Sequence, residues 1–179
     1  MAENINQNGI YGQFNQSIEK CKDLLLMNDD LIKFLYYKDS DFDIRNQKFK
    51  VDNKIKNYVK NNQFLYYNSL EDRQSHTYII IDMGKVNREE GFHADVVEQN
   101  FLEMRMYVYI CCHDDLCNTV NGDRIRCIEQ CIQDVCTNAE VDKSFHCWVG
   151  SSNPVSVAEN YKCRLVPILF SYFNTSRKW

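Results

Sequence analysis

The apolar side chains change their period within one stretch in the second half of the chain. Residues 104–112 are dense in aromatic and β-branched side chains, as is typical of a sheet. Over residues 123–138 the apolar positions instead recur every three or four residues, at Ile125, Ile128, Ile132 and Val135. Asn121 or Asp123 can cap the first turn of such a helix, and Gly122 permits a sharp turn before it. The pattern predicts a strand that leads through a short loop into an amphipathic helix.

Three further segments have the composition of strands, at residues 77–83, 144–149 and 161–173. We expect the first of them to pair with residues 104–112. Pro167 interrupts the last segment, and because proline has no N–H to donate to a ladder, it should lie at a bulge or on an unpaired edge. The four segments together predict a sheet of about four strands that is mostly antiparallel.

Short helices are predicted in the first third of the chain. One apolar stripe at helical spacing consists of Ile18, Cys21, Leu24 and Leu25. Residues 28–30 (Asn-Asp-Asp) can cap a second helix, and residues 51–59 support a third. With the helix over 123–138, these elements predict an α+β domain whose helices pack on one face of the sheet.

The length of 179 residues suits one domain with a substantial core. We assign residues 1–14 to a flexible N-terminal arm and residues 15–179 to a single domain. Residues 84–103 form a long inserted loop in this prediction, either an arm that contacts a neighbouring subunit or a plain mobile loop, because long loops inside compact domains are usually functional or disordered. The first residues lack the pattern of a signal peptide, and no apolar run approaches the ~20 residues that cross a bilayer. We therefore expect no membrane association.

The formal net charge is −4, which argues against a sequence-independent grip on nucleic-acid phosphates. Five lysines nevertheless crowd one short region, at Lys48, Lys50, Lys54, Lys56 and Lys60. They have two interpretations, a DNA-facing patch or a solvated helix surface, and we favour the second.

Nine cysteines raise the question of metal or thiol chemistry. An odd number without a signal peptide favours free thiols over a disulfide framework. Cys111, Cys112, His113 and Cys117 are close in sequence, but neighbouring residues of a strand point to opposite faces, so they are poorly placed to share one zinc ion. A Cys-His nucleophile is also disfavoured, because such sites are assembled from distant segments. We predict no catalytic, cofactor or metal site.

Two stretches resemble proteins that close the neck and tail of tailed bacteriophages. The strand that ends near His113, followed by a loop and the Gly-Asp-Arg-Ile-Arg helix start at residues 122–126, is similar to the middle of tail-terminator and head–tail joining proteins. Residues 29–41 are similar to the opening of such proteins in phages of low-GC hosts. The resemblance implies a virion protein without enzymatic activity that assembles in the host cytoplasm and forms a ring in the neck or upper tail.

In such a ring, six or twelve copies would surround a channel through which DNA passes without sequence-specific binding. The ring would contact other neck, portal or tail proteins. Apolar residues of the insertion and the basic-aromatic C-terminus are our candidate interface residues: Phe92, Val96, Val97, Phe101, Leu102, Arg177, Lys178 and Trp179. Two other functions remain open on the residues alone, a cytoplasmic protein-binding module and, less favoured, a small thiol or zinc enzyme.

Overall fold

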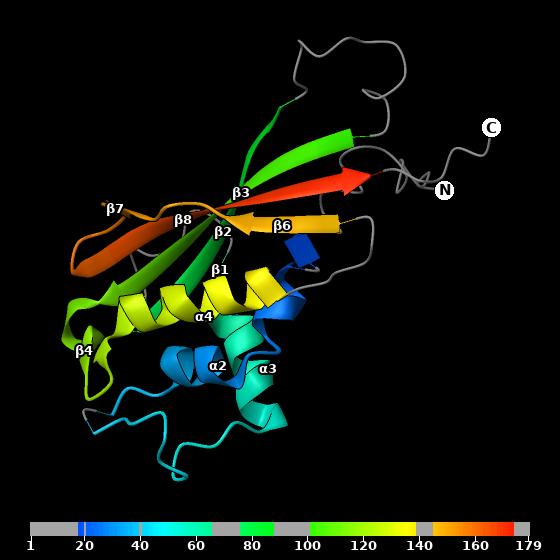
Figure 1. Cartoon of the computed structure of the whole chain (residues 1–179). Coiled ribbons are helices and arrows are strands. Elements are labelled where there is room, and N and C mark those ends of the chain that lie inside the picture. Colours follow the sequence, from blue (N-terminus) through cyan, green and yellow to red (C-terminus); the bar gives the residue numbers. More distant parts are fainter. Residues whose placement is uncertain are drawn as a thin grey trace, which may run out of the picture.

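The computed structural model describes residues 18–19, 21–39, 41–65, 76–87, 101–138 and 145–173. They form two layers, a sheet and a group of helices on one side of it (Figure 1). The helices are α2 (Asp29–Tyr36), α3 (Asn53–Asn62) and α4 (Arg124–Asn138), preceded by helical residues 21–25. This arrangement confirms the predicted α+β class with helices on one face.

The sheet has six strands, in the order β1-β2-β3-β8-β6 with β7 paired to β8. Only β1 and β2 run parallel, and the other pairs are antiparallel. The sequence predicted about four strands, and β1 and β7 were not among them because they are too short to show an alternating pattern. The strands are β1 (Phe64–Leu65), β2 (Thr77–Asn87), β3 (Phe101–His113), β6 (Phe145–Val149), β7 (Asn153–Val155) and β8 (Tyr161–Phe173). A separate hairpin consists of β4 (Asn118–Thr119) and β5 (Gly122–Asp123).

The inserted loop is shorter than predicted. β2 continues to Asn87 and β3 begins at Phe101, and their pairing extends from Thr77↔Cys112 to Asn87↔Glu103 across a register shift. The described strands overlap both ends of the loop predicted over about 84–103, since residues 84–87 belong to β2 and residues 101–103 belong to β3. Residues 88–100, like the predicted arm 1–14, lie outside the described residues.

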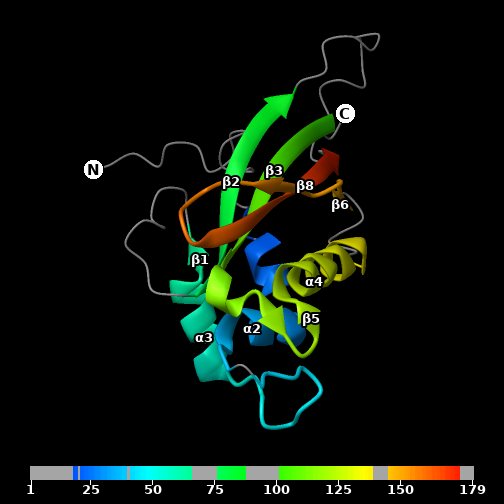
Figure 2. The same ribbon diagram turned by 90° about the vertical axis from the view of Figure 1, so that its left-hand side faces the viewer.

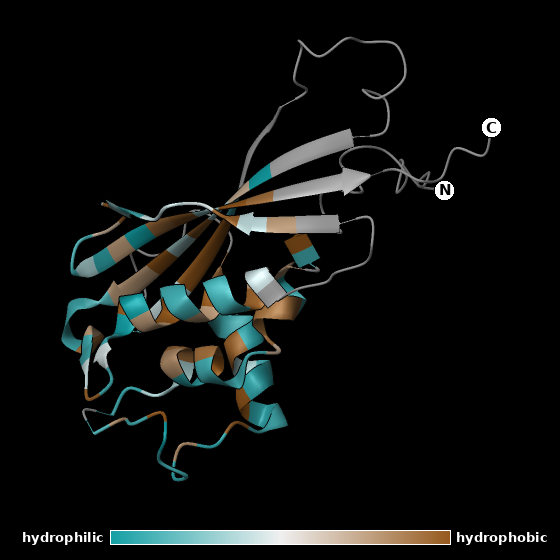
Figure 3. Ribbon diagram, in the orientation of Figure 1, coloured by the Kyte–Doolittle hydropathy of each residue, from teal (hydrophilic) through white to brown (hydrophobic). Residues whose placement is uncertain are grey.

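The main core lies between the helices and one face of the sheet. Ile79, Val108 and Ile110 from the strands are fully buried there with Ile128 and Ile132 of α4. Figure 3 shows hydrophobic residues concentrated where the strands face the helices. Because successive residues of a strand point to opposite faces, a second and smaller cluster forms on the other face, from Leu65, Tyr78, Ile80, Cys111 and Cys163.

Side-chain caps start the helices. Asn28 Oδ1 accepts a hydrogen bond from Leu31 N at 2.9 Å, as the sequence predicted for α2. Of the two candidate caps of α4, Asp123 has that role, since its Oδ1 accepts from Ile125 N at 2.9 Å. Gly122 has φ +105°, a conformation that L side chains rarely adopt, which confirms its role in the turn.

Pro167 does not lie on an edge strand, but it lies where residues 150–152 face only residues 166–167 between the β6 and β7 pairings, so the expected interruption of the ladder is present on one side. It is opposite Tyr107 in an unbroken β3–β8 ladder. On its other side β6 ends at Val149 and β7 begins at Asn153, and Gly150 N donates to Pro167 O at 2.8 Å. Since the N and O of one strand residue point the same way, the missing N–H faces the interruption between two short strands.

None of the helices in the described part of the chain is long and apolar enough to cross a membrane.

Candidate functional site

Arg124, the first residue of α4, is a buried cation that joins three segments of the chain. Its side chain is only 1% exposed. Nη1 donates to the backbone O of Phe34 at 2.5 Å and of Tyr37 at 2.7 Å, and Nε donates to Leu116 O at 2.8 Å. The guanidinium also lies over the Phe42 ring, 5.4 Å from its centroid. Carbonyls at the end of α2, which have no partner within the helix, are thereby satisfied.

Asn121 hydrogen-bonds the loop after α2 and so holds it near the start of α4. Its Nδ2 donates to Phe42 O at 3.0 Å, and its Oδ1 accepts from Ile44 N at 3.3 Å. Within the loop, Phe42 and Phe49 pack edge to face at 5.1 Å. The two stretches that carry the phage resemblance, 29–41 and 122–126, therefore form one packed unit. The hydrogen bonds of Arg124 and Asn121 described here all go to backbone groups, so these two side chains position the loop.

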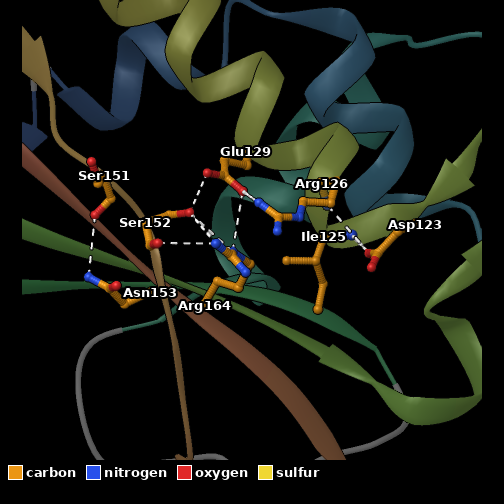
Figure 4. Close-up of polar contacts among 8 residues, drawn as sticks. All are labelled: Asp123, Ile125, Arg126, Glu129, Ser151, Ser152, Asn153 and Arg164. Atoms are coloured by element: carbon orange, nitrogen blue, oxygen red, sulfur yellow. Dashed lines mark hydrogen bonds and ion pairs between the residues drawn. The ribbon is translucent and has the colours of Figure 1, made fainter.

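A second polar cluster joins α4 to the sheet, and Figure 4 shows its side chains converging from three segments. Glu129 is 7% exposed, and its Oε2 lies 3.2 Å from Arg126 Nη1 and 3.3 Å from Arg164 Nε. Its Oε1 accepts from Ser152 Oγ. Arg164 Nη2 also donates to the backbone O of Ser152 at 3.1 Å. Both carboxylate oxygens are thus engaged by donors, which suits a structural clamp better than a catalytic base.

This cluster was not predicted from the sequence, although a signal existed. Glu129 lies four residues after Ile125 and three before Ile132, so it interrupts an apolar helical stripe. A charge within such a stripe needs a partner in the core. The sequence does not say which residue provides it, since Arg164 comes from the distant strand β8.

The cysteine-rich stretch separates as the strand geometry predicted. Cys112 lies in the main core and Cys111 in the smaller cluster on the other face. Burial raises the pKa of Cys112 to about 12 and also raises that of Cys117. Both are therefore protonated at neutral pH, which does not favour a thiolate nucleophile. Among the residues that the structure describes, no group of three or more His, Cys, Asp or Glu side chains is placed to hold a metal ion.

His76, just before β2, is part of a buried contact with α2. It is 8% exposed, and Gln63 Nε2 lies 3.4 Å from its Nδ1 while donating to Leu35 O at 2.5 Å. Burial, aided by the charge of Lys38, lowers the pKa of His76 below its ordinary value of 6.5. The neutral ring is the form that accepts from Gln63, so the contact links β1 and β2 to the end of α2 when His76 is unprotonated.

The lowered pKa of His76 predicts that the fold becomes less stable in acid. Because the folded pKa is lowered, the unfolded chain binds the His76 proton more readily, and the free energy of unfolding should fall as pH drops below about 6.5 towards the folded pKa. His76→Phe should reduce this slope, as measured by urea unfolding from about pH 7 to 5. His113→Phe, which keeps His76, is the control. Equal slopes for His76→Phe and the parent chain would contradict the assignment.

The lysine-rich region is largely compensated by acidic side chains. Three of its five lysines form ion pairs, Lys48 with Asp41 at 3.5 Å, Lys56 with Asp29 at 2.8 Å and Lys60 with Asp23 at 3.2 Å. The pairs are partly or largely exposed and contribute little stability. They do lower the local positive potential, which favours a solvated surface over a DNA-facing patch.

The candidate interface residues fall mostly outside the described part of the chain. This applies to Phe92, Val96, Val97, Arg177, Lys178 and Trp179. Phe101 and Leu102 begin β3, where their backbones pair with Phe173 and Tyr172 of β8. The two interface segments therefore attach to the sheet at the same end, since one precedes Phe101 and the other follows Phe173.

Comparison with protein families gives a match that includes both polar clusters. The sequence model of the YomW family matches residues 28–168, from the N-cap of α2 into β8. The chain belongs to the YomW family. The family name is that of a phage-derived protein of the Bacillus prophage type, which associates the chain with phages. A search among curated proteins found no match. The YomW match includes Arg124, Glu129 and Arg164, so both clusters are part of the family region.

Proposed function

We propose that the chain is a structural virion protein whose copies form a ring in the neck or upper tail, joining the head to the tail around the DNA channel. Membership of a phage-associated family supports the phage context. The resemblance of residues 29–41 and 122–126 to head–tail joining and tail-terminator proteins supports the position. In this proposal the chain acts by association and not by catalysis.

The observation that carries the proposal is the shape of the sheet. β2, β3 and β8 are 11, 13 and 13 residues long, and Figures 1 and 2 show their far ends extending past α2, α3 and α4. Asn87, Phe101 and Phe173 end the described strands there, and the candidate interface segments 88–100 and 174–179 are joined to the chain at these residues. Two segments with apolar anchors at one end suit contact with a neighbouring subunit.

A ring follows if this end binds a different surface on the next copy. Such a heterologous contact uses two unlike patches, and it generates a closed ring when the rotation between copies closes. We infer six or twelve copies. The net charge of −4 suits a channel that lets DNA pass without binding it. Portal, neck and tail proteins would contact the two sides of the ring.

Removing residues 88–100 or residues 177–179 tests the proposal. Replacing residues 88–100 by a short Gly-Ser linker, or removing residues 177–179, should leave a folded monomer whose circular dichroism matches that of the parent. Sedimentation should show loss of the six- or twelve-copy species, and phage carrying either variant should lack joined tails. The linker begins after Asn87 because Asn87 and the β2 residues before it pair with β3.

Met27→Ser is the matched control. Met27 is 74% exposed and lies in the turn before α2, outside both of the altered segments. It should leave the ring and the particles unchanged. If both truncated chains assemble normally, these segments do not hold the ring. If the parent chain is a monomer and is absent from purified virions, the ring proposal is wrong and a cytoplasmic protein-binding module becomes the better interpretation.

A further inference from the structure

Two buried cysteines face each other on the neighbouring strands β3 and β8, near one end of their ladder. Cys111 of β3 is directly opposite Cys163 of β8 in the antiparallel register. Opposed residues in such a ladder have Cα atoms about 4.5 or 5.5 Å apart, and both spacings lie within the range of about 4.4 to 6.8 Å that a disulfide spans. Their side chains point to the same face, because both belong to the smaller cluster. All nine cysteines are free in this structure.

We propose that Cys111 and Cys163 are an oxidative modification site, at which peroxide converts the thiol pair into a cross-strand disulfide. The Cys163 sulfur attacks one peroxide oxygen, the O–O bond breaks, and a sulfenic acid forms as the first water leaves. The Cys111 sulfur then attacks the Cys163 sulfur, the S–S bond forms, the S–O bond breaks, and the second water leaves with the remaining thiol proton. The two thiols are oxidised and the peroxide is reduced to two waters.

The surroundings of the two cysteines indicate which thiol attacks the peroxide and which one resolves the sulfenic acid. The Cys163 sulfur accepts hydrogen bonds from the Cys111 thiol and from the backbone N–H of Val157, and these bonds lower the pKa of Cys163. The same contact with Cys163, together with burial, raises the pKa of Cys111. Cys163 is therefore the thiol that forms a thiolate more readily, and Cys111 is suited to resolve its sulfenic acid.

Access of an oxidant to Cys111 and Cys163 depends on the few side chains that pack over them. The partly buried residues against this cluster are Tyr109, Val155, Val157, Ala158 and Tyr161. Four of these five come from residues 155–161, which run from the last residue of the three-residue strand β7 to the first residue of β8. Segments with few buried contacts open locally at low free-energy cost. A small oxidant such as hydrogen peroxide can therefore reach Cys163 without unfolding of the main core.

A second thiol pair provides an internal comparison. Cys136 of α4 and Cys147 of β6 also share a hydrogen bond, but a helix and a strand have no common register that fixes their Cα spacing. If proximity alone decided the outcome, both pairs would oxidise. The proposal instead places the first disulfide between Cys111 and Cys163.

The test treats the full-length reduced chain with hydrogen peroxide under native conditions. After denaturation and alkylation of the remaining thiols, the mass should show two unalkylated cysteines, and peptide mapping should join Cys111 to Cys163. The disulfide closes a loop of about 50 residues, so the melting temperature should rise by about 5–10 °C and return to its initial value with dithiothreitol. Cys163→Ser and Cys111→Ser should each abolish this cross-link. Cys131→Ser, which keeps the pair, should not.

Two results would overturn the inference. One is a native chain that stays fully reduced at a peroxide concentration that oxidises the urea-unfolded chain. The other is a first disulfide that maps to different cysteines, including Cys136 and Cys147. Mapping on the parent chain decides the question even if a serine variant does not fold. Neither readout depends on ring formation, so failure here leaves the proposed function untouched.

Discussion

Replacing Arg124 by methionine should destabilise the fold by about 3–5 kcal/mol. Methionine has a similar length but no donor, so the backbone oxygens of Phe34, Tyr37 and Leu116 each lose a hydrogen bond. Burial keeps water from replacing these bonds, since the side chain is 1% exposed. Unsatisfied buried carbonyls carry most of the expected loss. Urea unfolding followed by circular dichroism measures it.

Arg126→Met is the matched control for this change. Arg126 lies two residues further along α4, its side chain is 60% exposed, and it forms an ion pair with Glu129 at 3.2 Å. The same substitution there should cost less than about 1 kcal/mol. Equal losses at the two positions would mean that the bonds of Arg124 to the carbonyls do not stabilise the junction.

Replacing Ile128 by aspartate should have a comparable or larger effect. Ile128 is fully buried in the main core, on the face of α4 that packs against the sheet. A carboxylate there has no ion-pair partner from the apolar side chains of that core. The chain must leave it charged in a dry site, protonate it or unfold, and we expect a loss of about 4 kcal/mol or more. Thermal unfolding and the soluble yield should both report this loss.

Gln130→Asp controls for an added negative charge on the same helix. Gln130 is exposed, and its Nε2 donates to Asp134 Oδ1 at 2.8 Å. Loss of that bond and repulsion between carboxylates four residues apart should cost less than about 1 kcal/mol. If Ile128→Asp folds as stably as Gln130→Asp, the buried face of α4 is assigned incorrectly.

The order of helices and long strands could be predicted from the sequence because it follows from local patterns. Alternating and helical periods gave β2, β3, β8 and α4, and short-range caps gave the starts of α2 and α4. The split of Cys111 and Cys112 onto opposite faces also followed from strand geometry alone. All of these features depend on residues within a few positions of one another.

The α+β class, the buried stripe of α4, the separation of Cys111 from Cys112 and the phage resemblance follow from the amino-acid sequence alone. The short strands β1 and β7, the partners of Arg124 and Glu129, and the Cys111–Cys163 pairing depend on the packing of distant segments. Arg124 lies about 90 residues from Phe34, and no local pattern records such a distance. These partners are set by how whole elements pack, since a buried charge requires compensation but does not specify which distant segment supplies it.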